Sequence, residues 1–101
     1  MKLYLKRKYA DAIAEYDLET GSIVVKKGSL VSDDISYTEK FRGAFTIEKY
    51  RAQYVKDGVV VKDASFKSPS TAANFVTGRS TNGLTAWKDE KGEYLRKTIK
   101  K

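Results

Sequence analysis

The sequence contains neither cysteine nor histidine among its 101 residues. Without a thiol, the chain forms no disulfide, has no thiolate nucleophile and offers no sulfur ligand to zinc. Without an imidazole, it has no histidine general base and no Ser-His-Asp triad. The side chains left for chemistry are carboxylates, lysine, tyrosine, serine and threonine, which excludes these common kinds of catalytic and metal site.

Long apolar runs are also missing. The longest are short pieces such as 23–25 and 59–61, far below the ~20 residues that a bilayer-spanning helix needs. The first eight residues are basic, but neither an apolar stretch nor a small-residue cleavage site follows them, which argues against a signal peptide. With no disulfide use and no export signal, we expect a cytoplasmic location and no membrane partner.

The length of the chain and its apolar fraction of 41% are enough for one hydrophobic core. We therefore expect a single domain over 1–101, with 96–101 as a flexible basic tail. Because no disulfide can staple the fold, its stability has to come from packed strands and helices. The pattern described below predicts a small α+β domain with antiparallel-rich β hairpins and two short helices, at about 47–57 and 69–77.

Positive charge exceeds negative charge by seven, and it is unevenly spread. Residues 1–10 contain four basic and no acidic side chains, 91–101 contain five basic and one acidic, and 11–39 are acidic overall. If the two termini lie close together, their charges combine into one basic surface that suits a polyanion such as nucleic acid. The alternative stays open, because a net charge of about 2 to 8 is ordinary for a small soluble domain.

The first half of the chain predicts mainly extended segments and turns. Residues 3–9 are expected to be extended, and the small residues at 10–14 to form a turn or a short helical piece. Residues 17–21 have turn composition and 22–26 are rich in β-branched side chains, so together they predict a hairpin. The segment 30–45 is polar and is expected to be irregular.

The first predicted helix covers 47–57. Thr46 is expected to cap it and Gly58 to end it, and its apolar residues recur at the three- and four-residue spacing of one helix face. Arg51 falls on that face. A cation on an apolar stripe needs a partner, such as a carboxylate or an aromatic ring, unless it marks the edge of the stripe.

The second predicted helix has the clearest local signal in the chain. In the run 68–70, Ser-Pro-Ser, the first serine can cap the helix and the proline fits its first position, while Gly78 can end it. The Asn-Gly pair at 82–83 then predicts a turn, and 84–87 predicts a strand. A further turn and a returning strand are expected over 89–95.

Two groups of carboxylates are candidates for a catalytic or metal site. Asp89 and Lys91 form an Asp-x-Lys pair of the kind used by metal-dependent nucleases, but the same residues are typical of a hairpin tip. Asp33, Asp34 and Glu39 lack the Asp-x-Asp-x-Asp-Gly spacing that wraps calcium. We therefore expect no enzymatic activity, no catalytic residue, no metal and no cofactor.

The loop over 78–83 is the best candidate for a binding site. Its glycines resemble a phosphate-cradling loop, but it follows the predicted helix 69–77, so a Walker-type function is rejected. Trp87 supplies either an aromatic plane or core packing. The connection needs a turn former at Asn82 but no cation at 79 or 88. The predicted nucleic-acid-binding site consists of the residues that carry a cation or a hydrogen-bonding side chain there: Arg79, Ser80, Asn82 and Lys88.

The same region carries a family resemblance. The residues that carry it are Phe66-Lys67-Ser68-Pro69-Ser70-Thr71-Ala72-Ala73, Gly78-Arg79-Ser80-Thr81-Asn82-Gly83, Trp87-Lys88 and Gly92…Leu95. Upstream, Gly21…Val24…Lys26-x-Gly28-Ser29 and Arg51-x-x-Tyr54-Val55-x-x-Gly58 continue the likeness in order. Together they resemble the bacterial domain-of-unknown-function family 4357. Ser22, Leu84 and Tyr54 depart from the family pattern, which leaves core packing and any stacking role near residue 84 open.

The resemblance implies an accessory role close to DNA. Members of this family are often appended to GIY-YIG nuclease domains, and part of the motif is similar to restriction-and-adenine-methylase-associated domains. The expected function is a non-catalytic module that binds DNA or RNA, linked to DNA restriction, repair or modification, with a nuclease or methylase as protein partner. The alternative is a protein–protein interaction module of unknown partner, whose basic charge serves solubility only.

Overall fold

The computed structural model describes residues 1–36 and 43–99. Its main sheet is antiparallel, with the order β1-β2-β3-β6, where β1 is Lys2–Arg7, β2 is Ala10–Tyr16, β3 is Ile23–Val25 and β6 is Ala64–Phe66. A two-stranded sheet pairs β4 (Val55–Lys56) with β5 (Val59–Val60). The helices are α1 (Ala44–Tyr54), α2 (Pro69–Thr77), α3 (Gly83–Ala86) and α4 (Leu95–Ile99). The predicted α+β class is confirmed.

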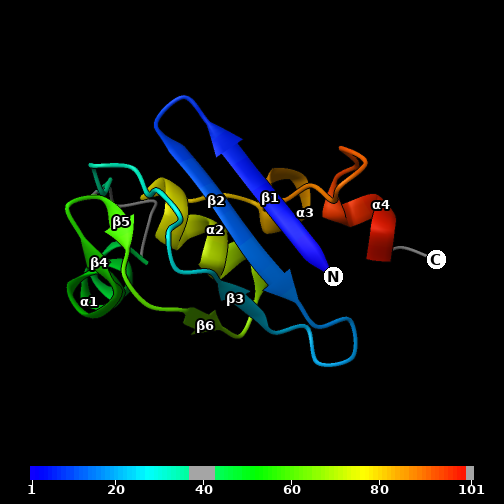
Figure 1. Ribbon diagram of the computed structural model, residues 1–101, viewed down its shortest axis with the longest axis horizontal. Coiled ribbons are helices and arrows are strands. Elements are labelled where there is room, and N and C mark those ends of the chain that lie inside the picture. The colour runs from blue at the N-terminus through cyan, green and yellow to red at the C-terminus, as the bar shows by residue number, and fades with distance from the viewer. Residues whose placement is uncertain (37–42, 100–101) are drawn as a thin grey trace.

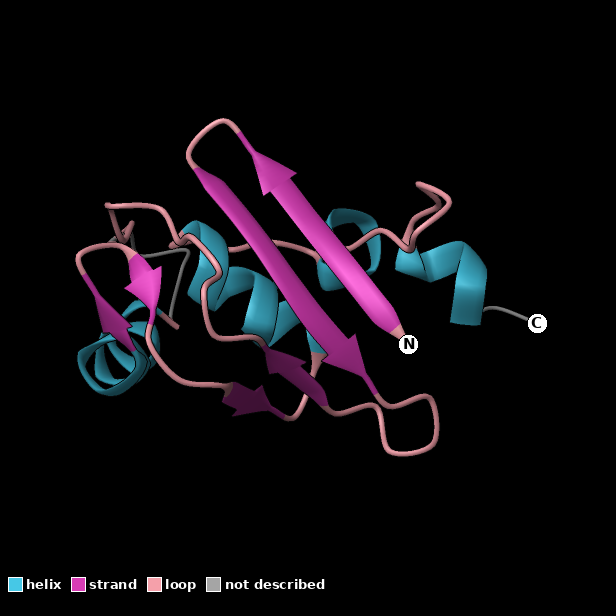
Figure 2. Ribbon diagram, viewed as in Figure 1, coloured by secondary structure: helices cyan, strands magenta, loops and turns pink. Residues whose placement is uncertain are grey.

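The helices are arranged around one face and two ends of the main sheet. In Figures 1 and 2, α2 and α3 lie behind β1 and β2, while α1 and the two-stranded sheet lie at one end and α4 at the other. The N-terminal end of β1 lies on the side of α4, and the β1–β2 turn lies at the far end of that strand. Among the described residues, no helix is long and apolar enough to cross a membrane.

Strand β2 is where the sequence prediction of a turn or short helical piece at 10–14 is wrong. Alanine has a weak strand preference, which made this segment look unlike a strand. The deciding feature is its two-residue period, because Ala10, Ala12, Ala14 and Tyr16 are buried while the residues between them are exposed. A strand with this pattern has one face on the core and one in water.

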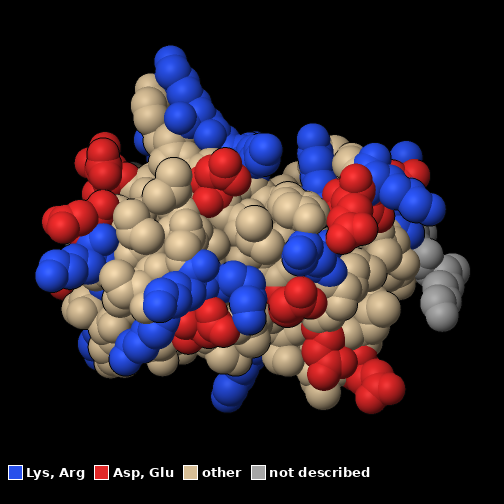
Figure 3. All heavy atoms as spheres, in the orientation of Figure 1, with Lys and Arg blue, Asp and Glu red and all other residues tan. Residues whose placement is uncertain are grey.

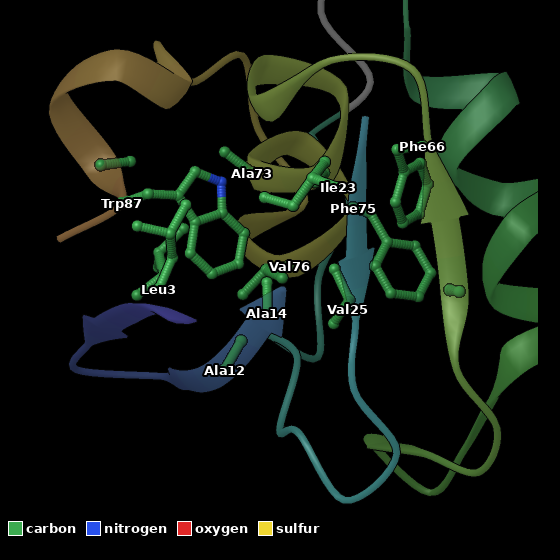
Figure 4. Packing of buried hydrophobic residues seen from close by; sticks show 14 of the residues in the cluster. Leu3, Ala12, Ala14, Ile23, Val25, Phe66, Ala73, Phe75, Val76 and Trp87 are labelled. Carbon is green, nitrogen blue, oxygen red and sulfur yellow. The ribbon is translucent and has the colours of Figure 1, made fainter. Parts of the chain in front are cut away.

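The small side chains of β2 let helix α2 approach the sheet closely. Helix α2 presents two alanines, Ala72 and Ala73, together with Phe75 and Val76 to the core, and all four are buried. Figure 4 shows the alanines of β2 on the side of the sheet that α2 covers. Larger side chains then close the core at its ends, with Trp87 beside Leu3 at one end and Phe66 beside Phe75 at the other (Figure 4).

Helix α2 begins and ends as the sequence predicts. The Ser68 hydroxyl oxygen accepts the Thr71 N–H at 3.2 Å, and Pro69 occupies the first helical position. Gly78 ends the helix in the left-handed region, with φ 73°. These signals are local, so each could be read from a few neighbouring residues.

Helix α1 starts and stops earlier than the predicted 47–57. Gly43 is its N-cap and makes no side-chain capping bond, so Thr46 lies inside the first turn. The helix ends at Tyr54 because the chain enters strand β4 at Val55, and Gly58 instead belongs to the β4–β5 turn. Of the predicted irregular segment 30–45, residues 31–36 form no helix or strand, 37–42 lie outside the described residues, and the last two belong to α1.

The C-terminal quarter is more helical than predicted. The expected strand at 84–87 is helix α3 followed by Trp87, because the Asn82 side-chain oxygen accepts the Leu84 N–H at 2.9 Å and caps a helix instead of making a hairpin turn. The residues from 96 to 99, expected in a flexible tail, lie in α4, and Ile99 packs against the core. Residues 100–101 lie outside the described residues.

Helix α3 is held directly against the start of α2. The Trp87 indole N–H donates to the Pro69 carbonyl at 3.0 Å, and the Gly83 N–H donates to the Ser70 hydroxyl at 3.0 Å. A Cβ atom on Gly83 would overlap the Pro69 carbonyl group. Two backbones therefore meet here without room for a methyl group, which explains the glycine by packing.

This contact predicts a large cost for a single added methyl group. We expect Gly83→Ala to destabilise the domain by about 3 kcal/mol or more, the upper end for overpacking against backbone. Gly92→Ala is the matched control, because Gly92 has φ 84° and open space around it, so alanine there costs only the left-handed strain of about 1 to 2 kcal/mol. Urea unfolding of both variants measures the difference, and equal costs would contradict the account.

Candidate functional site

Three segments far apart in the sequence surround one groove of about 890 Å³. They are the β1–β2 turn, the loop that follows β3, and the loop between α2 and α3 together with the start of α3. The residues that line the groove are Arg7, Lys8, Tyr9, Ala10, Ser32, Asp33, Asp34, Thr77, Arg79, Ser80, Thr81, Asn82 and Thr85.

The structure brings three of the four predicted site residues together and leaves out the fourth. Arg79, Ser80 and Asn82 line the groove. Lys88 does not, because its backbone forms a bridge with Tyr4 at the edge of the main sheet. The Lys88 ammonium lies 4.9 Å from the centre of the Tyr94 ring, so its partner is an aromatic side chain near α4.

The loop after α2 is fixed by hydrogen bonds of its own. The Asn74 side-chain oxygen accepts the Thr81 N–H at 2.8 Å, and the hydroxyls of Thr77 and Thr81 lie 2.7 Å apart. Arg79 and Ser80 are exposed, and their side chains take no part in these bonds. A rigid loop therefore presents a guanidinium and a hydroxyl to the groove.

Arg51 supplies the link between this loop and the loop after β3. Its guanidinium donates to the Ser32 carbonyl at 2.7 Å and to the Phe75 carbonyl at 2.9 and 3.1 Å, with a longer bond to the Val76 carbonyl at 3.4 Å. The sequence indicated that Arg51 needs a partner, such as a carboxylate or an aromatic ring, unless it marks the edge of the apolar stripe. The partners that it finds among the described residues include backbone carbonyls at the C-terminal end of α2, where the helix dipole favours a cation.

The same junction carries backbone bonds and a tightly packed glycine. The Ser32 N–H donates to the Val76 carbonyl at 2.9 Å, and the Ser36 N–H donates to the Gly78 carbonyl at 2.7 Å. A Cβ atom on Gly78 would overlap the Asp34 carbonyl oxygen. Two of the three groove segments are thus joined into one unit.

Trp87 and the start of α3 have structural roles. Trp87 is fully buried, so it offers no plane to a ligand, and core packing is the correct one of its two predicted roles. The loop over 78–83 precedes α3 as well as following α2, which the sequence analysis missed. The first amides of α3 are already bonded to Ser70 and Asn82, so the loop has no free amide cradle there.

The charges of the groove come from residues that the sequence did not place together. Arg7 and Lys8 join Arg79, and none of the three makes a salt bridge or a side-chain hydrogen bond to another residue within 1–36 and 43–99. Asp33 and Asp34 contribute carboxylates from the third segment. The groove therefore offers three available cations beside two acids.

The basic charge of the two ends of the chain forms two clusters instead of the single surface considered above. Figure 3 shows Lys and Arg atoms over the β1–β2 turn and again around α4, with Asp and Glu atoms interspersed on this face. The reason is the length of β1, which carries the run 6–8 away from the N-terminus to the far end of the strand. The basic run 6–8 is therefore the sequence feature that could have indicated Arg7 and Lys8 as groove residues.

The Asp-x-Lys pair is part of a turn. The Asp89 carboxylate accepts the N–H groups of Glu93 at 3.0 Å and Lys91 at 2.9 Å, and the Thr98 hydroxyl donates to it at 3.3 Å. These hydrogen bonds lower the pKa of Asp89 below its ordinary value, and the bond from the Glu93 N–H has the largest effect. Among the described residues, no three acidic side chains gather to hold a metal, and Glu39 lies outside them.

The lowered pKa of Asp89 predicts a dependence of stability on pH. Because the folded-state pKa lies below the unfolded value of about 3.9, the contribution of Asp89 is complete above that value and is lost as the pH falls through the folded-state pKa. We expect Asp89→Asn to lower the melting temperature at neutral pH. On acidification, the melting temperature of this variant should then fall by less than that of the wild-type protein. Thermal melting at neutral pH and below pH ~4 tests this.

Glu90→Gln is the matched control, because the neighbouring carboxylate accepts none of these hydrogen bonds. The control should keep the acid sensitivity of the wild-type protein. An Asp89→Asn variant that loses as much stability on acidification as the wild type would contradict the assignment.

One family model matches nearly the whole chain. It is described as "Domain of unknown function (DUF4357)" and covers residues 3–99. No curated protein and no solved structure shows significant similarity to the chain.

Proposed function

The chain belongs to the DUF4357 family, and from that premise we propose that it is a non-catalytic nucleic-acid-binding accessory module. The proposal includes a link to DNA restriction, repair or modification, a nuclease or methylase as protein partner, and a cytoplasmic setting. Its binding site is the groove defined above, with Arg7, Lys8 and Arg79 as the residues that contact phosphates.

The observation that carries the proposal is the convergence of these three cations. They come from two segments about 70 residues apart in the chain, and the fold places them around one groove without an acidic partner among the described residues. A cation that serves the fold usually pairs with a carboxylate or a helix end, as the half-buried Arg51 does at the end of α2. Cations left available in a groove favour a polyanion, because neutralising phosphates releases counterions.

Hydrogen-bonding groups beside the cations support the same site. The Ser80 hydroxyl and the Asn82 amide nitrogen are exposed at the groove, and such groups commonly contact phosphate and sugar oxygens. The engagement of Asp89 in its turn supports the non-catalytic part of the proposal, because this carboxylate already accepts three hydrogen bonds.

The proposal predicts weak binding that depends steeply on salt. With about three phosphates neutralised, the slope of log affinity against log salt should be about −2 to −3. Removing two of the cations in Arg7→Ala/Arg79→Ala should lower the affinity at least tenfold, roughly 1.4 kcal/mol, and flatten the slope by about 2. Electrophoretic mobility shifts on single- and double-stranded DNA and RNA measure both.

Lys88→Ala is the matched control, because it removes one positive charge outside the groove. It should leave the affinity within about twofold of the wild-type value, and all variants should melt near the wild-type temperature because the side chains are exposed. Binding that does not change with salt, or an equal loss of affinity in Lys88→Ala and in Arg7→Ala/Arg79→Ala, would contradict the groove as the site.

A protein–protein interaction module is the second candidate, and one feature favours it. The open face of the main sheet carries a hollow of about 530 Å³ where Ile13 and Leu30 are 39% and 47% exposed. Charged side chains of both signs, from lysines and from acidic residues, surround these two apolar residues. If this face is the functional one, Ile13→Ser should abolish partner capture while the groove variants leave it unchanged.

A further inference from the structure

The turn between β1 and β2 is formed by residue types that are unusual in a two-residue hairpin turn. The last paired residues are Arg7 and Ala10, so Lys8 and Tyr9 alone make the connection. Two-residue hairpin turns favour Asn-Gly and similar pairs, because both central residues usually take a positive φ. Here neither does. The β4–β5 turn of the same chain follows the usual rule, with Asp57 at φ 53° and Gly58 at φ 78°.

Tyr9 projects a large aromatic ring from this turn into solvent. Its side chain is 70% exposed, although it lines the groove. A bulky aromatic residue at a tight turn gains little from burial, and departures from local rules concentrate at functional positions. The exposed ring therefore suits a ligand with an aromatic or apolar face.

The surroundings of the ring are cationic. The Lys8 ammonium lies 5.5 Å from the centre of the Tyr9 ring, Arg7 is the preceding residue, and Arg79 lines the same groove from another segment. An aromatic ring in a groove with cations suits a nucleotide, because the base can stack on the ring while the adjacent phosphates meet the positive charges.

The same groove favours one strand over a duplex. A base can stack on Tyr9 only if its face is free, and in a duplex both faces of an internal base are covered by its neighbours. Asp33 and Asp34 would repel the second phosphate backbone of a duplex. An unpaired strand can turn its phosphates to the cations and its base amino groups to these carboxylates, which accept hydrogen bonds from them.

We propose that the groove binds single-stranded nucleic acid, with an unpaired base stacked on Tyr9 and the flanking phosphates held by Arg7, Lys8 and Arg79. This inference rests on the proposed function and specifies its ligand. DNA and RNA share the base and phosphate chemistry on which it depends.

The test is fluorescence anisotropy with a labelled oligonucleotide of about 12 nucleotides, within the site sizes known for single-strand binders. The wild-type protein should bind the single strand about tenfold more tightly than the same sequence as a duplex. Tyr9→Ala should weaken single-strand binding by about 5- to 150-fold, the loss of one stacked base, and Tyr9→Phe should restore it.

Tyr94→Ala is the matched control, because Tyr94 is also an exposed tyrosine beneath a lysine but lies outside the groove. It should bind like the wild type. Unchanged binding by a folded Tyr9→Ala variant, or a wild-type preference for the duplex, would overturn the single-strand inference while the proposed function stands. Failure of the wild-type protein to bind either form would overturn both.

Discussion

The candidate site depends on the hydrogen bonds that the Arg51 guanidinium donates to backbone carbonyls of two segments. A helix ends in carbonyl groups that carry partial negative charge and need hydrogen-bond donors. At the end of helix α2, the carbonyls of Phe75 and Val76 accept hydrogen bonds from Arg51 of helix α1, whose guanidinium also donates to the Ser32 carbonyl. One side chain thus satisfies the end of a core helix and fixes the loop after β3 against it.

This arrangement matters for an anionic ligand. Without Arg51, the groove would lie beside the negative end of α2 and beside Asp33 and Asp34, which together oppose the cations of Arg7 and Arg79. The positive charge of the guanidinium offsets part of that negative potential. It acts by positioning and by charge, since the groove itself is lined by other side chains.

Local signals could be read from the sequence, and contacts between distant segments could not. Ser68 and Gly78 set the ends of α2 through their immediate neighbours, so the sequence predicted that helix closely. Strand β2 was missed because its alanines have weak intrinsic preference, and their small size only has meaning against helix α2. Asn82 caps a helix because Gly83 packs on Pro69, a contact across 14 residues that the dipeptide does not reveal.

The candidate site divides along the same line. Arg79, Ser80 and Asn82 were predicted because they bring a cation and hydrogen-bonding side chains to one loop, and they do meet at one groove. Lys88 was predicted on the same ground, but the sheet edge carries it elsewhere. Arg7 and Tyr9 were missed because nothing in the sequence indicates a turn at 8–9, where the usual turn residues are absent.

The central claim is that Arg51 joins α2 to the loop after β3, and amide hydrogen exchange in Arg51→Lys tests it most directly. Lysine keeps the charge and the aliphatic stem but cannot donate to both segments in the planar geometry of a guanidinium. We predict that the Ser32 and Ser36 amides lose at least tenfold of their protection while the amide of Leu5 in β1 keeps its own. Unchanged protection of both serine amides in the folded variant would contradict the account.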